Sequence, residues 1–352
     1  MAALWQESPF EEEIAGGESD RGGGCDSGGC DSCCGDSCGG CGDCCEPCGC
    51  GCSCPLPGWQ IFGDYLFLRP RNAEVVYAVP FNGPIDSPPA VPIQVGRTAV
   101  ADYGYESGFR AGFTRAFDDC ASLGVTYTYF ESNTTDDISI DVPYVIRSMV
   151  SHPSTWTATS DGLDANAEAG IDFDLIDLDY RSVFLCGPHY SMNYLVGLRY
   201  GYLSQDFRSQ FAINGRESVS TDIRFDGGGI RLGLEGERYF CCSRLMVYGR
   251  GTASFVVGEF NASYPQGQAF DASVVDTGWS AGRVVPIMDL EVGVGWTSRS
   301  GRLRLTTGYM ISAWYNTVKT DDFIEGVRTN DFVGLGDKLT FDGLTSRIEL
   351  RY

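Results

Sequence analysis

The chain has 352 residues, enough for one large domain or two ordinary ones, and its 46 glycines, 18 tyrosines and 20 phenylalanines favour many strands and turns. Its formal net charge is −22 and no basic stripe offsets it, so nucleic acid is excluded as a partner because the chain repels phosphates. No run of 18 apolar residues occurs, which excludes a transmembrane helix but not a membrane barrel, whose strands alternate between lipid and lumen.

Residues 1–57 form an acidic leader that is rich in glycine and cysteine. The leader holds 11 acidic residues and one basic residue, and twelve of the sixteen cysteines lie between Cys25 and Cys54. It has almost no other apolar side chains and is unable to build a core, so we expect it to be disordered or linked by disulfides. Metal binding through its CxxC pairs is the remaining alternative.

The amino terminus does not have the pattern of a signal peptide. Its first seven residues, MAALWQE, lack both a basic segment and an apolar stretch. Because the rest of the chain indicates export, we interpret this as a start codon assigned too far downstream.

From Gly58 onward, apolar and polar side chains alternate in stretches of ten to fifteen residues, as in strands with two different faces. The last stretch, 344–352, is the clearest example. The expected strands are 59–70, 105–117, 121–131, 171–186, 191–205, 224–238, 244–258, 285–297, 302–316 and 340–352. Ten residues tilted by about 45° rise roughly 23 Å, close to the apolar band of roughly 25 Å around an outer-membrane barrel.

The predicted connections alternate in length. Short turns are expected near 118–120, 187–190, 239–243 and 298–301, and long loops near 71–104, 132–170, 206–223, 259–284 and 317–339. Short periplasmic turns and long external loops are typical of outer-membrane barrels, and an even strand number returns both termini to the periplasm. The sequence therefore predicts an all-β, antiparallel, up-and-down transmembrane barrel of about ten strands over 58–352, with eight or twelve strands as alternatives. A soluble β-sandwich or barrel is the other alternative, since its strands also alternate on one face.

Three segments carry a resemblance to a known family. They are GDYLFLRP at 63–70, followed by an Asn/Tyr-rich loop, GFRAGF at 108–113 and SRIELRY at 346–352. The chain resembles the Legionella-type pore-forming outer-membrane protein family, also found in planctomycete-like bacteria, over roughly 58–352. The resemblance implies passive pore formation without catalytic residues, whereas the Cys-rich leader departs from the family's usual start.

Charged side chains lie on the strand face opposite the apolar one and are expected to line the lumen. The pore-lining candidates are Arg110, Arg181, Arg199, Arg231, Glu235, Arg250, Asp289, Glu291, Arg302, Arg304, Arg347 and Glu349. They predict either a charged constriction that selects solutes or cross-lumen ion pairs that close a narrow barrel. The first implies a pore for passive diffusion of small hydrophilic solutes or ions, and the second implies a structural barrel that anchors the envelope. The near balance of signs leaves ion selectivity open.

Four cysteines lie outside the leader, and all four fall at or beside predicted periplasmic turns. They are Cys120, Cys186, Cys241 and Cys242. We expect these disulfide candidates to cross-link with the leader or with neighbouring envelope proteins. Chance placement on one side is the alternative interpretation.

The sequence gives little support to an enzyme. Its two histidines, His152 and His189, are expected at opposite ends of the barrel, and only His152 shares a loop with Asp136 and Asp137. We predict no catalytic residues, no metal site and no cofactor. The acidic external loops are interpreted as a solvated face, with divalent cations that bridge lipopolysaccharide as the alternative. The expected partners are outer-membrane lipid, including lipopolysaccharide, and small hydrophilic solutes.

Overall fold

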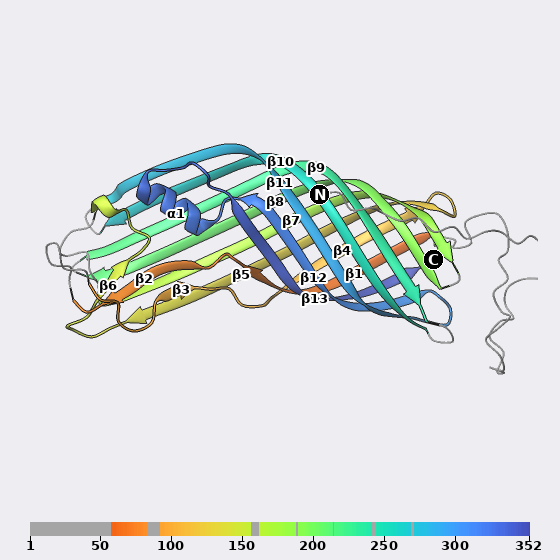
Figure 1. The fold of residues 1–352 in the computed structure, drawn as a ribbon, viewed down its shortest axis with the longest axis horizontal. Coiled ribbons are helices and arrows are strands. Elements are labelled where there is room, and N and C mark those ends of the chain that lie inside the picture. Colours follow the sequence, from red (N-terminus) through yellow and green to blue (C-terminus); the bar gives the residue numbers. More distant parts are fainter. Residues whose placement is uncertain are drawn as a thin grey trace, which may run out of the picture. The chain divides into compact units, whose positions relative to one another are not determined.

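The computed structural model describes residues 58–83, 92–155, 162–187, 189–213, 215–240, 244–268 and 271–352, and the leader lies outside them. Within these residues, ten long strands form a closed antiparallel barrel (Figure 1). The barrel strands are β1 (Trp59–Arg71), β4 (Glu106–Ala116), β5 (Ala121–Ser139), β7 (Asp164–Gly187), β8 (Tyr190–Ile213), β9 (Gly215–Tyr239), β10 (Leu245–Gln268), β11 (Asp271–Thr297), β12 (Leu303–Thr317) and β13 (Asp337–Arg351). Strand β1 closes the barrel by pairing with both β13 and β4. The predicted ten-strand barrel is confirmed.

Two of the predicted long loops are wrong, because residues 206–223 and 259–284 continue the strand hairpins β8–β9 and β10–β11. Small and polar side chains cover the outward face of these extensions, which gives them the composition of loops. Their inward face stays apolar, and Phe207, Phe211 and Ile223 are buried on it. The burial of this inward face keeps the strands extended well beyond the length needed to cross lipid.

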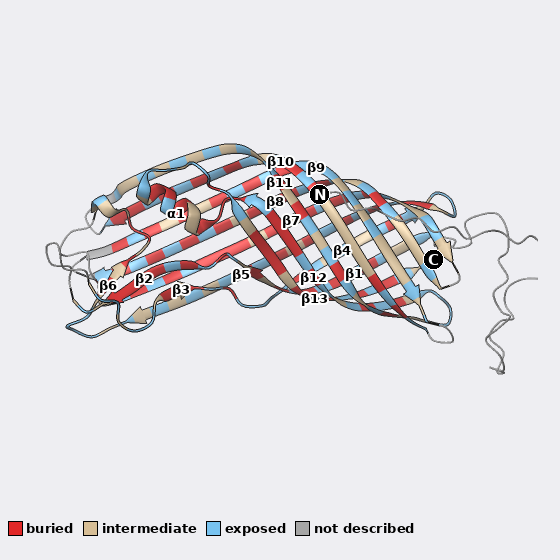
Figure 2. Cartoon of the chain, in the orientation of Figure 1, coloured by how far each residue is buried: buried red, intermediate tan, exposed pale blue. Residues whose placement is uncertain are grey.

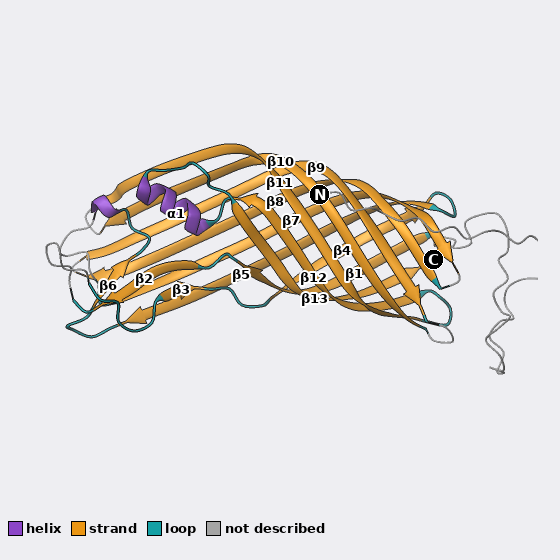
Figure 3. Ribbon diagram, viewed as in Figure 1, coloured by secondary structure: helices purple, strands orange, loops and turns teal. Residues whose placement is uncertain are grey.

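The other long connections contain smaller elements. The predicted loop of 132–170 is strand at both ends, since β5 runs on to Ser139 and β7 begins at Asp164. The additional elements are β2 (Val75–Phe81), β3 (Ala99–Ala101), β6 (Val145–Ser148), a 3₁₀ turn (Pro153–Thr155) and α1 (Thr320–Thr329), which is the longer purple segment in Figure 3. Strands β3, β2 and β6 form a separate three-stranded sheet in that order.

The barrel strands present an apolar face outward, and buried and exposed residues alternate along them (Figure 2). On β9, Ile230, Leu232 and Leu234 are 46–55% exposed. Large exposed apolar side chains recur on all ten barrel strands. Contact with lipid stabilises a continuous apolar exterior of this kind, whereas water does not. No helix among the described residues is long and apolar enough to cross a membrane.

Glycines allow β9 and β10 to approach closely at the point where they extend beyond the apolar band. A Cβ at Gly229 would lie 1.8 Å from the carbonyl oxygen of Phe255, and a Cβ at Gly258 would lie 2.1 Å from that of Asp226. Any side chain at Gly229 or Gly258 would push the two strands apart, so the local twist of the sheet depends on glycine.

The exposed apolar face leads to a prediction about Leu232. Arginine at this position should destabilise the barrel in lipid vesicles by about 2–4 kcal/mol, because the charge enters the apolar part of the bilayer. Urea-induced unfolding of the vesicle-embedded protein measures this loss. Ser218→Arg is the matched control, since Ser218 faces outward on the polar extension of the same strand and should change stability little. Equal losses from both variants would contradict a lipid-facing position for Leu232.

Candidate functional site in the barrel interior

The half of the barrel next to the turns that join β4 to β5 and β11 to β12 is lined by charges, and we call this half the charged lumen. The same end holds the start of β1 and the end of β13, where Trp59 N donates to Tyr352 O at 2.9 Å. The charged lumen contains eight arginines and eight carboxylates among the described residues: Arg110, Arg181, Arg199, Arg231, Arg250, Arg304, Arg347, Arg351, Asp64, Asp177, Asp179, Glu235, Glu237, Asp289, Glu291 and Glu349. All lie on the inward positions of their strands, so the period of two decides which charges meet.

Some of these charges pair directly across neighbouring strands. Arg347 on β13 lies in register with Asp64 on β1 and donates from Nε and Nη2 to its two carboxylate oxygens at 2.6 and 2.8 Å. Arg199 on β8 makes the same two-pronged contact with Asp177 on β7, at 2.6 and 2.9 Å. Each arginine presents a planar fork that matches a carboxylate, which makes these pairs geometrically specific.

Other pairs join strands that are not neighbours and therefore cross the lumen. Arg110 on β4 contacts Glu291 on β11 at 3.2 Å, and Arg199 on β8 contacts Asp289 on β11 at 2.7 Å. A third link joins Arg304 on β12 to Glu237 on β9, also at 2.7 Å. Since β4 and β11 lie far apart in the strand order, these links hold distant parts of the wall together.

Small cavities remain between the ion pairs. One of about 60 Å³ lies beside Arg110 and Asp177. Another of about 130 Å³, closer to the turn end, is lined by residues that include Glu237, Arg304 and Arg351. Charged side chains line both cavities, and each is large enough for several water molecules, so the charged lumen is narrow but suited to water.

Four aromatic side chains close the lumen on the loop side of the charges, and we call them the aromatic layer. Phe130, Phe173, Trp314 and Phe341 come from β5, β7, β12 and β13, and each is at most 1% exposed. The ring centroids of Phe173 and Phe341 are 4.7 Å apart, and those of Phe173 and Trp314 are 5.8 Å apart. Ser312 joins the two layers, because its Oγ accepts from Trp314 Nε1 and donates to Asp289.

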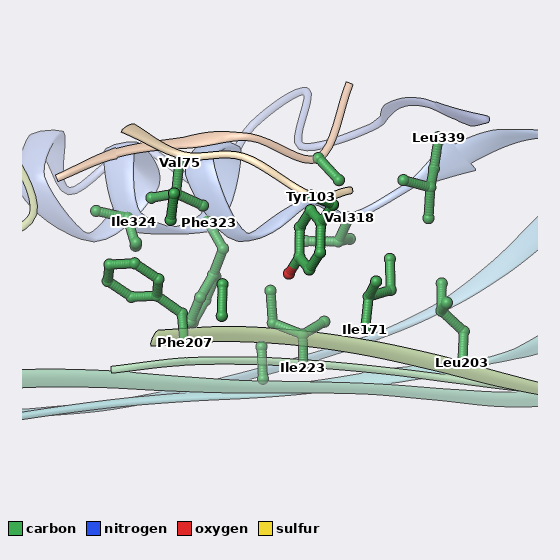
Figure 4. Packing of buried hydrophobic residues seen from close by; sticks show 14 of the residues in the cluster. Val75, Tyr103, Ile171, Leu203, Phe207, Ile223, Val318, Phe323, Ile324 and Leu339 are labelled. Carbon is green, nitrogen blue, oxygen red and sulfur yellow. The ribbon is translucent and has the colours of Figure 1, made fainter. Parts of the chain in front are cut away.

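Beyond the aromatic layer, the small sheet β2–β3–β6 and helix α1 fill the space against the inner face of the extended strands, and we call these elements the plug. Figure 4 shows Phe207 and Ile223 of the wall pointing toward Val75 and Phe323 of the plug. All four are at most 2% exposed. The plug thus continues the barrel core without a break among the described residues.

Polar contacts fix the start of α1 in place. Gln205 Nε2 on the wall donates to the carbonyl oxygen of Val318 at 2.8 Å. Lys319 Nζ lies 2.8 Å from Asp337 and also contacts Asp321 and Asp322. Burial alone would lower the pKa of Lys319, but these three carboxylates outweigh it and raise that pKa, so the lysine stays charged.

The structure brings together eleven of the twelve predicted pore-lining residues. Arg302 lies apart from them, exposed in the turn between β11 and β12. Among the cysteines, Cys120 and Cys186 lie at the turn end as expected, with Val183 N donating to Cys120 O at 2.9 Å. Cys241 and Cys242 lie outside the described residues, so the disulfide network stays a prediction.

His152 and Asp136 both lie at the loop end, but they contact different residues. The backbone N–H of His152 donates to Gln266 Oε1, whereas Asp136 accepts from Tyr77 and Arg97. The aromatic layer and the plug were not predicted from the sequence. A signal for the aromatic layer existed, since all four rings occupy inward positions just beyond the charges.

Removing one member of a buried ion pair tests the charged lumen. Arg347→Ala should destabilise the vesicle-embedded barrel by about 3–5 kcal/mol, because Asp64 loses its closest partner while staying buried. The double variant Asp64→Leu/Arg347→Met should recover most of this loss in urea unfolding. Arg302→Ala is the control and should be within roughly 0.5 kcal/mol of the parent. A single variant as stable as the double variant would contradict the proposed role of the pair.

A family model described as Legionella pneumophila major outer membrane protein precursor matches residues 52–343. Among solved structures, the outer membrane protease OmpT from Escherichia coli is similar at 10% identity over 84% of this chain and 96% of that chain, with a TM-score of 0.48. The toluene transporters TodX from Pseudomonas putida and TbuX from Ralstonia pickettii each match at 9% identity over 84% of this chain and 90% of theirs, with TM-scores of 0.32 and 0.28. No curated protein sequence matches the chain. Because the family model spans most of the sequence, this outer-membrane β-barrel belongs to the Legionella pneumophila major outer membrane protein family.

Proposed function

We propose that this chain is a narrow outer-membrane pore for passive diffusion of small hydrophilic solutes or ions, and that the described conformation is its closed state. The observation that supports this proposal is that the two halves of the lumen are lined by different kinds of side chain. The loop-side half is filled with apolar side chains, whereas the turn-side half holds sixteen charges and small polar cavities. A barrel that only needed to be solid would gain stability from apolar filling throughout, because buried ion pairs rarely repay the cost of desolvation. Charges kept in one half therefore favour a path for water and ions.

Closure in this proposal depends on the aromatic layer and the plug. The ion pairs leave polar gaps, but Phe173, Trp314 and Phe341 meet ring to ring across the lumen. Opening then requires these rings to separate and the plug to shift. Equal numbers of positive and negative charges in the lumen lead us to expect weak selectivity between cations and anions.

We further propose that both termini face the periplasm and that the extended strands β7–β11 stand outside the cell. Short turns at the terminal end and long excursions at the other end support this orientation, which is usual for such barrels. No catalytic step is part of the proposal.

A second candidate is a closed structural barrel that anchors the envelope through disulfides of its Cys-rich leader. The cross-lumen pairs Arg110–Glu291 and Arg304–Glu237 favour it, since they hold the wall in a fixed, filled state. The placement of Cys120 and Cys186 at the terminal end also favours it, because Gly58, the first described residue, lies at the same end.

Planar-bilayer conductance separates the two candidates. We expect rare, brief channel openings from the parent protein and a several-fold higher open probability from Trp314→Ala/Phe341→Ala, because this double variant removes half of the aromatic layer. Phe109→Ala is the matched control, since Phe109 faces outward on β4 and should leave conductance unchanged. Folding of each variant is verified by its heat-dependent gel migration. If the parent, the double variant and the control all fold but show no conductance, the proposed pore is wrong and the structural barrel is favoured.

Disulfide cross-linking has its own test. Protein from intact cells should migrate differently on gels with and without reductant, and Cys120→Ser/Cys186→Ser should reduce the fraction of cross-linked species. Full alkylation of all thiols without reduction, together with unchanged migration, would refute the cross-link.

A further inference from the structure

The loop end of the barrel has a low side and a tall side. Strands β1 and β12 end at Arg71 and Thr317, while the hairpins β8–β9 and β10–β11 continue for about ten residues more. On the low side, the rim therefore lies close to the edge of the apolar band. Side chains that face outward here meet lipid headgroups rather than open water.

Three cations gather on the outward face of this low rim. Arg69 and Arg71 follow the exposed Tyr65 and Phe67 on β1. Arg71 lies in register with Thr340 on β13, so Lys338, two residues away on the same face, is its diagonal neighbour at roughly 7–8 Å between Cα atoms. The low rim thus places two arginines and a lysine on one small surface.

Neighbouring groups hold the two arginines in position. Arg69 Nη2 donates to Asp102 at 2.7 Å, and Arg71 Nε donates to Asp342 at 2.7 Å. Arg71 Nη2 also donates to Tyr105 Oη at 3.1 Å. These contacts use only part of each guanidinium fork, so further N–H donors remain for a ligand.

Lys338 is different, because it has no carboxylate within 4.0 Å among the described residues. Its ammonium group lies over the ring of Tyr315, whose centroid is 5.7 Å from Nζ. The half-buried Lys338 therefore adds to the low rim a positive charge that no carboxylate of the described residues pairs.

The tall side has the opposite charge where its apolar band ends. The outward residues that follow the band there include Glu131 on β5, Asp172 and Asp174 on β7, and Glu259 on β10. The outward arginines of the tall side, Arg208 and Arg224, lie further along the strands, and Arg224 is paired with Asp222. This contrast makes the low rim a selective surface rather than one part of a uniform belt.

We infer that Arg69, Arg71 and Lys338 bind the phosphate of an outer-leaflet lipid headgroup. The inference rests on the proposed orientation, with the loop end outside the cell. Basic side chains at a membrane surface attract anionic headgroups, and arginine donors match phosphate oxygens. Tyr105 and Tyr315 flank the cations at the depth where aromatic girdles meet headgroups, so the lipid chains can lie along the apolar wall below.

Native mass spectrometry of the detergent-solubilised full chain tests the inference with lipid A as the probe. The parent protein should retain lipid A, and Arg71→Ala/Lys338→Ala should bind it about 25-fold more weakly, at about fivefold per cation removed. Arg208→Ala/Arg224→Ala is the matched control, because both arginines face outward on the tall side, and it should bind like the parent. Lys338→Ala alone should lose about fivefold, and it leaves the Arg71 contacts intact.

Enzymatically dephosphorylated lipid A identifies the group that is recognised. The parent protein should bind this lipid as weakly as the double variant binds lipid A, and inorganic phosphate should not displace the lipid. Equal binding of the two lipids, or equal losses in the double variant and its control, would overturn the inference. Displacement by inorganic phosphate would contradict the proposal that the recognised phosphate belongs to a lipid. Bilayer conductance of the double variant should match that of the parent, so failure of the lipid site is separable from failure of the pore.

Discussion

Charges that are enclosed in a narrow lumen must neutralise one another, and the architecture of this barrel depends on that constraint. Every strand turns one face to lipid and the other inward, and all the barrel strands except β5 supply arginine or carboxylate side chains to the charged lumen. Pairs between neighbouring strands, such as Asp64 with Arg347, secure the seam where the barrel closes. Pairs across the lumen, such as Arg199 with Asp289, draw opposite walls together. The number of strands sets the width of the bore, and the ion pairs fill that bore and reinforce the seam between β1 and β13.

The change from charged to apolar filling divides the barrel along its axis. Ser312 stands at this boundary, bonded to Asp289 on one side and to Trp314 on the other. On the loop side of Ser312, the elements of the plug complete the core together with the barrel strands. The plug is built from segments far apart in the sequence, since Val75 and Phe323 both pack over Phe207 and Ile223 of the wall (Figure 4). Ser312 thus links the packing of the loop-side half to the ion pairs of the charged lumen.

Alternation alone was enough to predict the barrel, because lipid and lumen impose a period of two on each strand. It placed Leu232 outside and Arg347 inside correctly. It did not predict which charges pair across the lumen, since Arg110 meets Glu291 only after ten strands have closed at a particular diameter. The strand extensions were missed because polar outward residues such as Ser218 resemble a loop, while the apolar partners of the inward face come from distant segments. The leader lies outside the described residues, and the prediction that it forms cross-links rests on its cysteines.

The plug is supported unequally by its surroundings. Long strands stand behind it on the side of β7–β11, whereas β1, β12 and β13 end below it. The wall therefore supports the plug on one flank only, where the long strands stand.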